Sequence, residues 1–139
     1  MNELLEVTNM FPNKESILLL CKKLNLQPPD DFEQDWEYEV VDPNRIGDFL
    51  LLYSNDKSLT ENEKVTLGIL IIGSLNEAVD IGIFSEDLWD TSWNTLKKDL
   101  GLHSRTLNYW ACWGKKDITN CFPISQKLRS VLKQDGKTF

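Results

Sequence analysis

A dense group of carboxylates lies near the start of the chain, between residues 30 and 42. It contains seven acidic residues and no lysine or arginine: Asp30, Asp31, Glu33, Asp35, Glu37, Glu39 and Asp42. Two such carboxyl groups can act as the general acid and base of a glycosidase-like hydrolase. That chemistry needs one carboxyl group in an apolar pocket that raises its pKa. A dense cluster without a nearby base is more typical of a solvated surface, so a small carboxylate-dependent hydrolase is the weaker alternative.

The other reactive side chains form no catalytic or metal-binding motif. The chain has one histidine, His103, which we interpret as a capping or packing residue in a connection between helices. The cysteines lack the spacing of zinc ligands. A nucleophilic pair of His103 with Cys112 or Cys121 stays open beside the simpler interpretation that these cysteines are buried packing groups. The sequence contains no glycine-rich phosphate loop and no GxSxG motif. We therefore expect no catalytic residue, no metal and no cofactor.

Aromatic residues are interleaved with the acidic ones, which suggests a surface that binds a partner. Runs of charge often only solvate a protein, and the chain would then be an acidic adaptor or regulatory protein. The sharper hypothesis is electrostatic mimicry, in which carboxylates occupy the basic cleft where a nuclease binds phosphates. Trp36 and Tyr38 would anchor the partner, although Trp36 fits a core position equally well. The candidate partner-binding residues are Asp30, Asp31, Glu33, Asp35, Trp36, Glu37, Tyr38, Glu39, Asp42 and Asp48.

The distribution of charge supports this choice of surface. The net charge is −7, and residues 1–60 carry twelve acids and five bases, whereas residues 61–139 carry ten of each. The whole excess of negative charge therefore belongs to the first part of the chain. Affinity for nucleic acid is built largely from lysine and arginine, so we expect a basic protein partner and no direct binding of nucleic acid.

The cysteine count and the chain start bear on the compartment. Three cysteines at unrelated spacings argue against a disulfide framework and for a reducing environment. The first residues lack the pattern of a signal peptide, and no apolar run approaches the ~20 residues of a membrane span. We expect a cytoplasmic protein without a membrane segment.

Helices must position the acidic stretch. Residues 14–25 have one apolar face and are predicted to form a helix that ends before Pro28-Pro29. Asp42 is a good N-cap for a helix that begins at Pro43 and runs to about Ser54. Between these helices, acidic and apolar residues alternate with the period of a strand. This favours an extended segment lying on a helical body, with a short irregular helix as the alternative.

The central part of the chain predicts a long buried helix. Thr60 and Glu63 have the spacing of a capping box, and the residues that follow are apolar on nearly every face. Gly68 and Gly73 within this helix predict close packing of a neighbouring helix, because each costs roughly 1 kcal/mol of helix stability relative to alanine.

The second half of the chain predicts three further helices. Ser85 is expected to cap a helix that ends at Gly101. Ser104 is expected to cap a short helix that ends at Gly114, and a last helix follows Phe122–Ser125. The sum is an all-α, single-domain bundle of six to seven helices over residues 1–139, with a frayed tail at 134–139. Two adjacent pairs, 43–81 and 85–113, are candidates for stacked helical hairpins.

Three runs between residues 35 and 125 carry a resemblance to a known class of proteins. They are DWEYEVVDPNRIGDFLLLY, LTENEKVTLGILIIGSL and LWDTSWNTLKKDLGLHSRTLNYWACWG. An acidic entry containing tryptophan, a helix beginning Asn-Arg-Ile, a buried helix containing Glu-Lys and a late Tyr-Trp pair resemble small bacterial immunity proteins. Such proteins are encoded beside polymorphic or contact-dependent growth inhibition toxins. The resemblance implies a cytoplasmic protein that binds and neutralises one cognate toxin domain, often a basic nuclease. It assigns no role to an individual residue.

Overall fold

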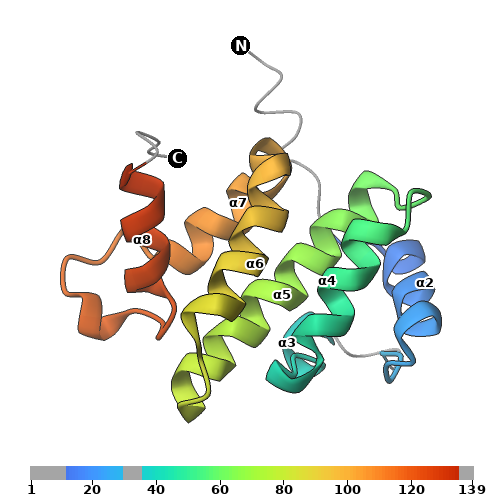
Figure 1. The fold of residues 1–139 in the computed structure, drawn as a ribbon, viewed down its shortest axis with the longest axis horizontal. Coiled ribbons are helices and arrows are strands. Elements are labelled where there is room, and N and C mark those ends of the chain that lie inside the picture. Colours follow the sequence, from blue (N-terminus) through green and yellow to red (C-terminus); the bar gives the residue numbers. More distant parts are fainter. Residues whose placement is uncertain (1–11, 30–35, 135–139) are drawn as a thin grey trace.

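The structure is a computed structural model that describes residues 12–29 and 36–134, and the elements in these ranges are helical (Figure 1). The α-helices are α2 (Lys14–Leu24), α3 (Trp36–Glu39), α4 (Ile46–Asn55), α5 (Glu61–Ile81), α6 (Glu86–Leu96), α7 (Leu100–Ala111) and α8 (Ser125–Gln134). Three short 3-10 turns join them: η1 (Pro43–Arg45), η2 (Lys97–Asp99) and η3 (Ile118–Asn120). These ranges contain no strand, which confirms the predicted all-α class. The tail beyond Gln134 lies outside the described residues.

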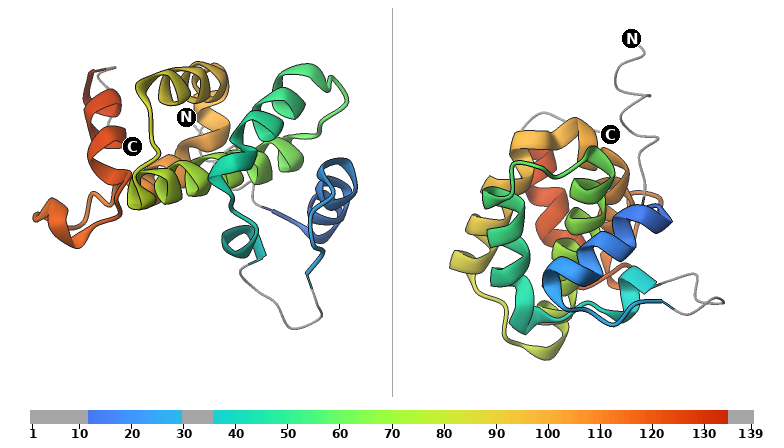
Figure 2. Two further views of the ribbon diagram at one scale, coloured as in Figure 1. Left: turned by 60° about the horizontal axis from the view of Figure 1, so that its bottom comes forward. Right: turned by 90° about the vertical axis from the view of Figure 1, so that its right-hand side faces the viewer.

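Helix α5 is the centre of the fold, as its nearly continuous apolar sequence predicts. The Glu63 amide donates to Thr60 Oγ1 (3.2 Å) and the Thr60 amide donates to Glu63 Oε1 (2.9 Å), so the predicted capping box is confirmed. Helices α2, α3, α4, α6 and α7 all pack against α5. Figure 2 shows α4 and α6 on one side of α5 and α3 on the other. The buried side chains of α5 therefore link the packing of nearly every other element.

Two glycines of α5 let neighbouring segments approach closely. The predicted packing of a neighbouring helix is confirmed at Gly68, whereas the close neighbour of Gly73 is a segment outside the helices. A Cβ atom on Gly68 would lie 2.5 Å from Nδ1 of His103 in α7. A Cβ atom on Gly73 would lie 2.7 Å from Cγ1 of Val41, in the segment before η1. Non-bonded atoms do not approach so closely, so these contacts require a residue without a side chain.

The junction between α6 and α7 differs from the prediction. Gly101 lies in the first turn of α7 and does not end α6, and Ser104 is buried inside α7, where its hydroxyl donates to the Gly101 carbonyl (3.2 Å). Helix α7 ends before Cys112, which adopts the left-handed conformation expected for Gly114 (φ 62°). The helix continues through Gly101 because burial of Leu102 stabilises it by more than the roughly 1 kcal/mol that glycine costs.

The segment from α3 to α4 also corrects one expectation. Residues 36–39 form one helical turn, so the extended conformation is wrong there and the short irregular helix is the form the chain adopts. Asp42 caps the next element as predicted, since its Oδ1 accepts from the Asn44 amide (2.9 Å). The first turn after Asp42 is a 3-10 turn, and the α-helix begins at Ile46. Without a neighbouring strand, the alternating segment has no backbone partner that would keep it extended.

The helices pair unevenly along the chain. Helix α4 packs against α5, as expected for a hairpin formed by residues 43–81. Helix α6 packs mainly against α4 and α5, whereas α7 packs mainly against α5 and α8. The helices of the second candidate hairpin, 85–113, therefore find their principal neighbours outside their own pair.

Candidate partner-binding surface

The predicted partner-binding stretch is only partly covered by the structure. Asp30, Asp31, Glu33 and Asp35 lie outside the described residues, as does the side chain of Tyr38. Glu37 and Glu39 lie on α3, where Glu37 is half-buried and Glu39 is exposed. Of the two acidic residues of α3, Glu39 is thus the exposed one.

Trp36 does not act as a surface anchor, which corrects the sequence-based assignment. Its side chain is only 2 % exposed and belongs to the hydrophobic core. The indole N–H donates to the carbonyl oxygen of Gln27 (2.7 Å), which satisfies the polar atom of the ring inside the protein. The ring therefore fastens α3 to the segment after α2. The core position that the sequence left open is the one observed.

Asp42 and Asp48, the last two predicted residues, have structural partners. The half-buried Asp42 caps η1 through its carboxylate, and its amide donates to Ser74 Oγ of α5 (2.9 Å). Asp48 is exposed but accepts from Arg45 Nε (2.7 Å). Both carboxylates therefore help to hold the α3–α4 segment in place, and the charge of Asp48 is offset by Arg45.

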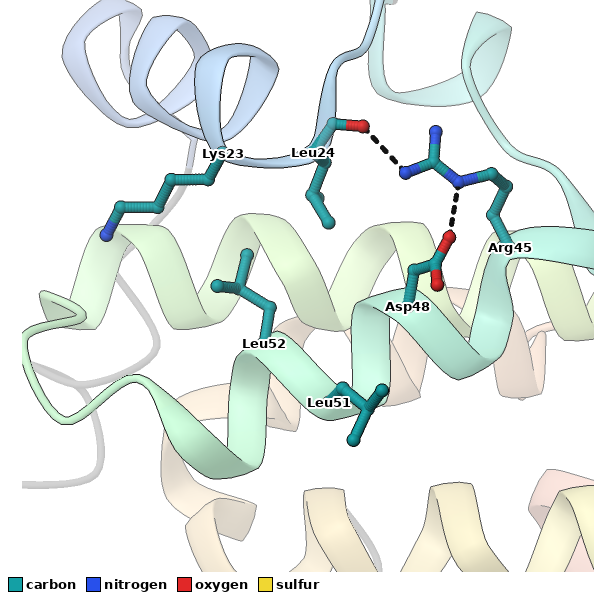
Figure 3. A pocket seen from close by; sticks show the side chains of 6 residues that line it. All are labelled: Lys23, Leu24, Arg45, Asp48, Leu51 and Leu52. Carbon is teal, nitrogen blue, oxygen red and sulfur yellow. Dashed lines mark hydrogen bonds and ion pairs between the residues drawn. The ribbon is translucent and has the colours of Figure 1, made fainter.

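A groove between α2 and α4 contains this ion pair (Figure 3). Its volume is about 460 Å³, and it is lined by Lys23, Leu24, Arg45, Asp48, Leu51 and Leu52. Arg45 also donates through Nη2 to the Leu24 carbonyl (2.6 Å) at the end of α2, which satisfies one of the free carbonyls of the last helical turn. Because Lys23 and Arg45 line the groove together with Asp48, the single acid of its described lining, the groove carries no excess of negative charge.

A buried polar cluster joins α4, η2 and α7. The Tyr53 hydroxyl lies 2.7 Å from Asp99 Oδ2 and 2.7 Å from His103 Nε2. The Asp99 carboxylate can only accept, so the Tyr53 proton points to it. The Nε2–H of His103 must then donate to Tyr53. His103 Nδ1 faces Gly68 and has no hydrogen-bond partner among the described residues.

Burial keeps His103 neutral. The side chain is 1 % exposed, and this desolvation lowers the pKa of His103 to about 4, with the negative charge of Asp99 opposing the shift and Lys64 adding to it. Burial and the hydrogen bond to Asp99 raise the pKa of Tyr53 well above its usual value. His103 is therefore a packing residue, as predicted, but it lies inside α7 and not in a connection. In the sequence, Gly68 was the residue that indicated a close contact at this point of α5.

The cysteines correct a second expectation. Cys112 and Cys121 form a disulfide across the α7–α8 connection, with their Cα atoms 5.9 Å apart, whereas Cys21 is free and buried. The three cysteines are an odd number, and their spacings match no motif. For these two reasons the sequence argued against a disulfide framework. Since both are bonded to each other, neither forms the nucleophilic pair with His103 that the sequence left open.

Arg129 of α8 fixes the same connection. Its Nε donates to the Ala111 carbonyl (2.7 Å), and its Nη2 donates to the carbonyls of Cys112 and Lys115. The guanidinium also lies over the ring of Trp113, 5.4 Å from the ring centroid. One side chain thus satisfies the carbonyl groups at the end of α7 and holds α8 against them.

The carboxyl groups with clearly shifted pKa values do not have the character of a general acid. Hydrogen bonds from Lys23 and Ser58 lower the pKa of Asp56 to about 2, and hydrogen bonds from Thr119 lower the pKa of Asp117. Over the described part of the chain, no three histidine, cysteine or acidic residues lie close enough together to hold a metal ion. No helix in that part combines the length and the hydropathy that crossing a bilayer requires.

No family model, curated protein or solved structure matches this chain.

Proposed function

We propose that the protein is an immunity protein that binds and neutralises one cognate toxin domain by stoichiometric inhibition. The sequence resemblance motivates this proposal, and the uncompensated negative charge of the surface is the observation that carries it. Ion pairs among the described residues hold Asp48, Asp56, Asp99 and Glu86. Six further carboxylates take part in none of these pairs: Glu15, Glu61, Glu77, Asp80, Asp87 and Asp90.

Free surface carboxylates favour a basic partner for two physical reasons. Complementary potentials raise the association rate, and like charges repel unsuitable partners. A toxin domain that cleaves nucleic acid carries a basic cleft for phosphates. Carboxylates that enter such a cleft would exclude the substrate, so inhibition needs no turnover and no cofactor.

An immunity function requires a toxin gene beside this one, so the proposal is tested by coexpression with the C-terminal domain that the adjacent gene encodes. We expect the two proteins to copurify as an equimolar complex and the toxin domain to lose its activity. A toxin domain from an unrelated locus is the control and should not copurify. Absence of a tight complex with the neighbouring domain would refute the immunity function.

Charge reversal tests the contribution of the acidic stretch separately. We expect Asp35→Lys with Glu39→Lys to slow association with the toxin domain and to weaken its dependence on salt. Glu15→Lys with Glu61→Lys changes the net charge equally at two of the other surface carboxylates, so the comparison isolates what the position of residues 30–42 adds to the association rate. Equal association rates for the two double variants would remove electrostatic mimicry by residues 30–42 and leave the immunity function intact.

A further inference from the structure

The turn between α5 and α6 exposes two large aliphatic side chains. We call residues 79–87 the α5–α6 corner. Ile81 is 54 % exposed and Ile83 is 48 % exposed, on either side of Gly82 in its left-handed conformation (φ 81°). The amides of Gly82 and Ile83 donate back to α5, including a 2.9 Å bond from Ile83 to the Ala78 carbonyl. In this kind of helix ending, the residue after glycine commonly packs against the helix. Here it stays half exposed on a fixed backbone.

A mostly apolar pocket lies at the same corner. Val79 and Phe84 of the corner line it together with Pro123, two residues before α8, and its volume is about 310 Å³. Gln126, Lys127 and Ser130 of α8 complete the lining. The corner therefore carries a partly apolar recess and, at residues 81 and 83, two exposed aliphatic side chains; desolvated apolar groups of this kind anchor many protein interfaces.

Among the described residues, the only charged one that lines this recess is Lys127, whereas the helices that meet at the corner carry a strongly negative charge. Residues 65–96 contain no lysine or arginine and five acids: Glu77, Asp80, Glu86, Asp87 and Asp90. Lys127 of α8 pairs with Glu86 (2.6 Å) and also lies over the ring of Trp89 (5.8 Å). The other four acids form no ion pair within the described residues. A second copy of the chain would bring the same charges against this surface, so a basic partner fits and self-association does not.

Helix α5 connects the corner with Asp42, the last residue of the acidic stretch predicted from the sequence. The Asp42 amide is bonded to Ser74, and Asp80 follows six residues later on α5, which corresponds to roughly 9 Å along the helix. Figure 1 shows α3 and the α5–α6 corner at the same lower edge of the molecule. An interface that begins at the acidic stretch can therefore extend over the corner.

We infer that the α5–α6 corner is the apolar anchor of the interface with the toxin domain. This inference rests on the proposed function and names the surface that performs it. The occupant is a basic face of that domain, which covers Ile81 and Ile83 and sets an aliphatic side chain, or the stem of a lysine or arginine, into the recess. Asp80 and Asp87 contact its positive charges. The corner supplies the anchor that the buried Trp36 cannot.

Binding kinetics with the neighbouring toxin's C-terminal domain test this surface. Ile81→Ser with Ile83→Ser should raise the dissociation rate about tenfold or more, with an unchanged circular dichroism spectrum because both side chains are exposed. Asp80→Lys with Asp87→Lys should instead slow association about tenfold at low salt. Leu18→Ser, at an exposed aliphatic position of α2, is the matched control and should bind like the wild type.

Three outcomes would overturn the inference. Wild-type affinity in the isoleucine double variant would show that the corner is not the anchor, while the immunity function would stand. Dimers of the wild-type chain that dissociate in this variant, with toxin binding unchanged, would identify a second copy as the occupant. Failure of the wild-type protein itself to bind the toxin domain would remove the proposed function and the inference together.

Discussion

Lowering the pH from 7 to 5 should destabilise this protein through a single side chain. His103 is the only histidine of the chain, so it is the only side chain whose ordinary pKa lies in this range. In the folded protein it is buried between Tyr53 and Gly68, and its pKa is lowered to about 4. In the unfolded chain it returns to its ordinary value of 6.5.

The size of the effect follows from proton linkage. Between pH 6.5 and pH 4 the unfolded chain binds a proton at His103 that the folded protein does not bind. The part of the free energy of unfolding that depends on a neutral His103 is therefore fully present above pH 6.5, and it is lost progressively as the pH falls from 6.5 towards 4. Each pH unit below 6.5 costs about 1.4 kcal/mol, so the loss at pH 5 is about 2 kcal/mol. Carboxyl groups of ordinary pKa titrate mainly below this window.

Urea unfolding at pH 7 and pH 5, followed by tryptophan fluorescence, measures this loss directly. The variant His103→Gln is the control, because it lacks the titrating group but keeps a side-chain donor near Tyr53. We expect it to have nearly the same stability at both pH values. A wild-type stability that does not change between pH 7 and 5, or an equal loss in His103→Gln, would refute the burial of a neutral imidazole at this site.

Three further predictions concern packing, capping and the disulfide. Gly68→Ala should lower the free energy of unfolding by roughly 1–3 kcal/mol because the new methyl group clashes with the imidazole of His103. Gly47→Ala is the control: a Cβ atom there meets nothing within 4 Å, so the free energy of unfolding should rise by up to about 1 kcal/mol. Urea unfolding compares the two variants. Thr60→Ala removes the capping box of α5 and should cost about 1 kcal/mol, measured by thermal unfolding. Reducing the Cys112–Cys121 disulfide should cost about 2–3 kcal/mol, and thiol titration of the unfolded protein before and after reduction should count one and then three thiols.

The parts of the fold that follow from local chemistry could be predicted from the sequence. The Thr60–Glu63 capping box and the Ser85 cap depend on side chains within three residues of the amides that they bind. The sequence therefore gives nearly the right start for α5 and α6. The prediction that a helix ends at Gly101 was wrong. Glycine interrupts a helix only weakly, and the burial of Leu102 outweighs the cost of placing Gly101 inside α7.

The sequence shows the charge of the acidic stretch but not where its side chains lie. Local composition reveals the acidic stretch, but it does not show that Trp36 turns into the core, because that depends on the carbonyl of Gln27 and on α5. The exposure of Ile83 could not be predicted either, since an aliphatic residue beside a glycine turn resembles a packing residue in sequence. The disulfide could not be predicted because contacts of α8 bring Cys121 back to the end of α7.

Helix α5 also separates the two ends of the molecule thermodynamically. Helix α2 is tied to it through Ser16 and Thr66 (3.2 Å), and the start of α8 is tied to it through Ile124 and Asn76 (3.1 Å). The two attachment points are ten residues apart on α5, or roughly 15 Å along its axis. Substitutions that far apart and without shared neighbours usually have additive effects on stability. Variation at the α8 end can therefore accumulate without changing how much a substitution in α2 costs.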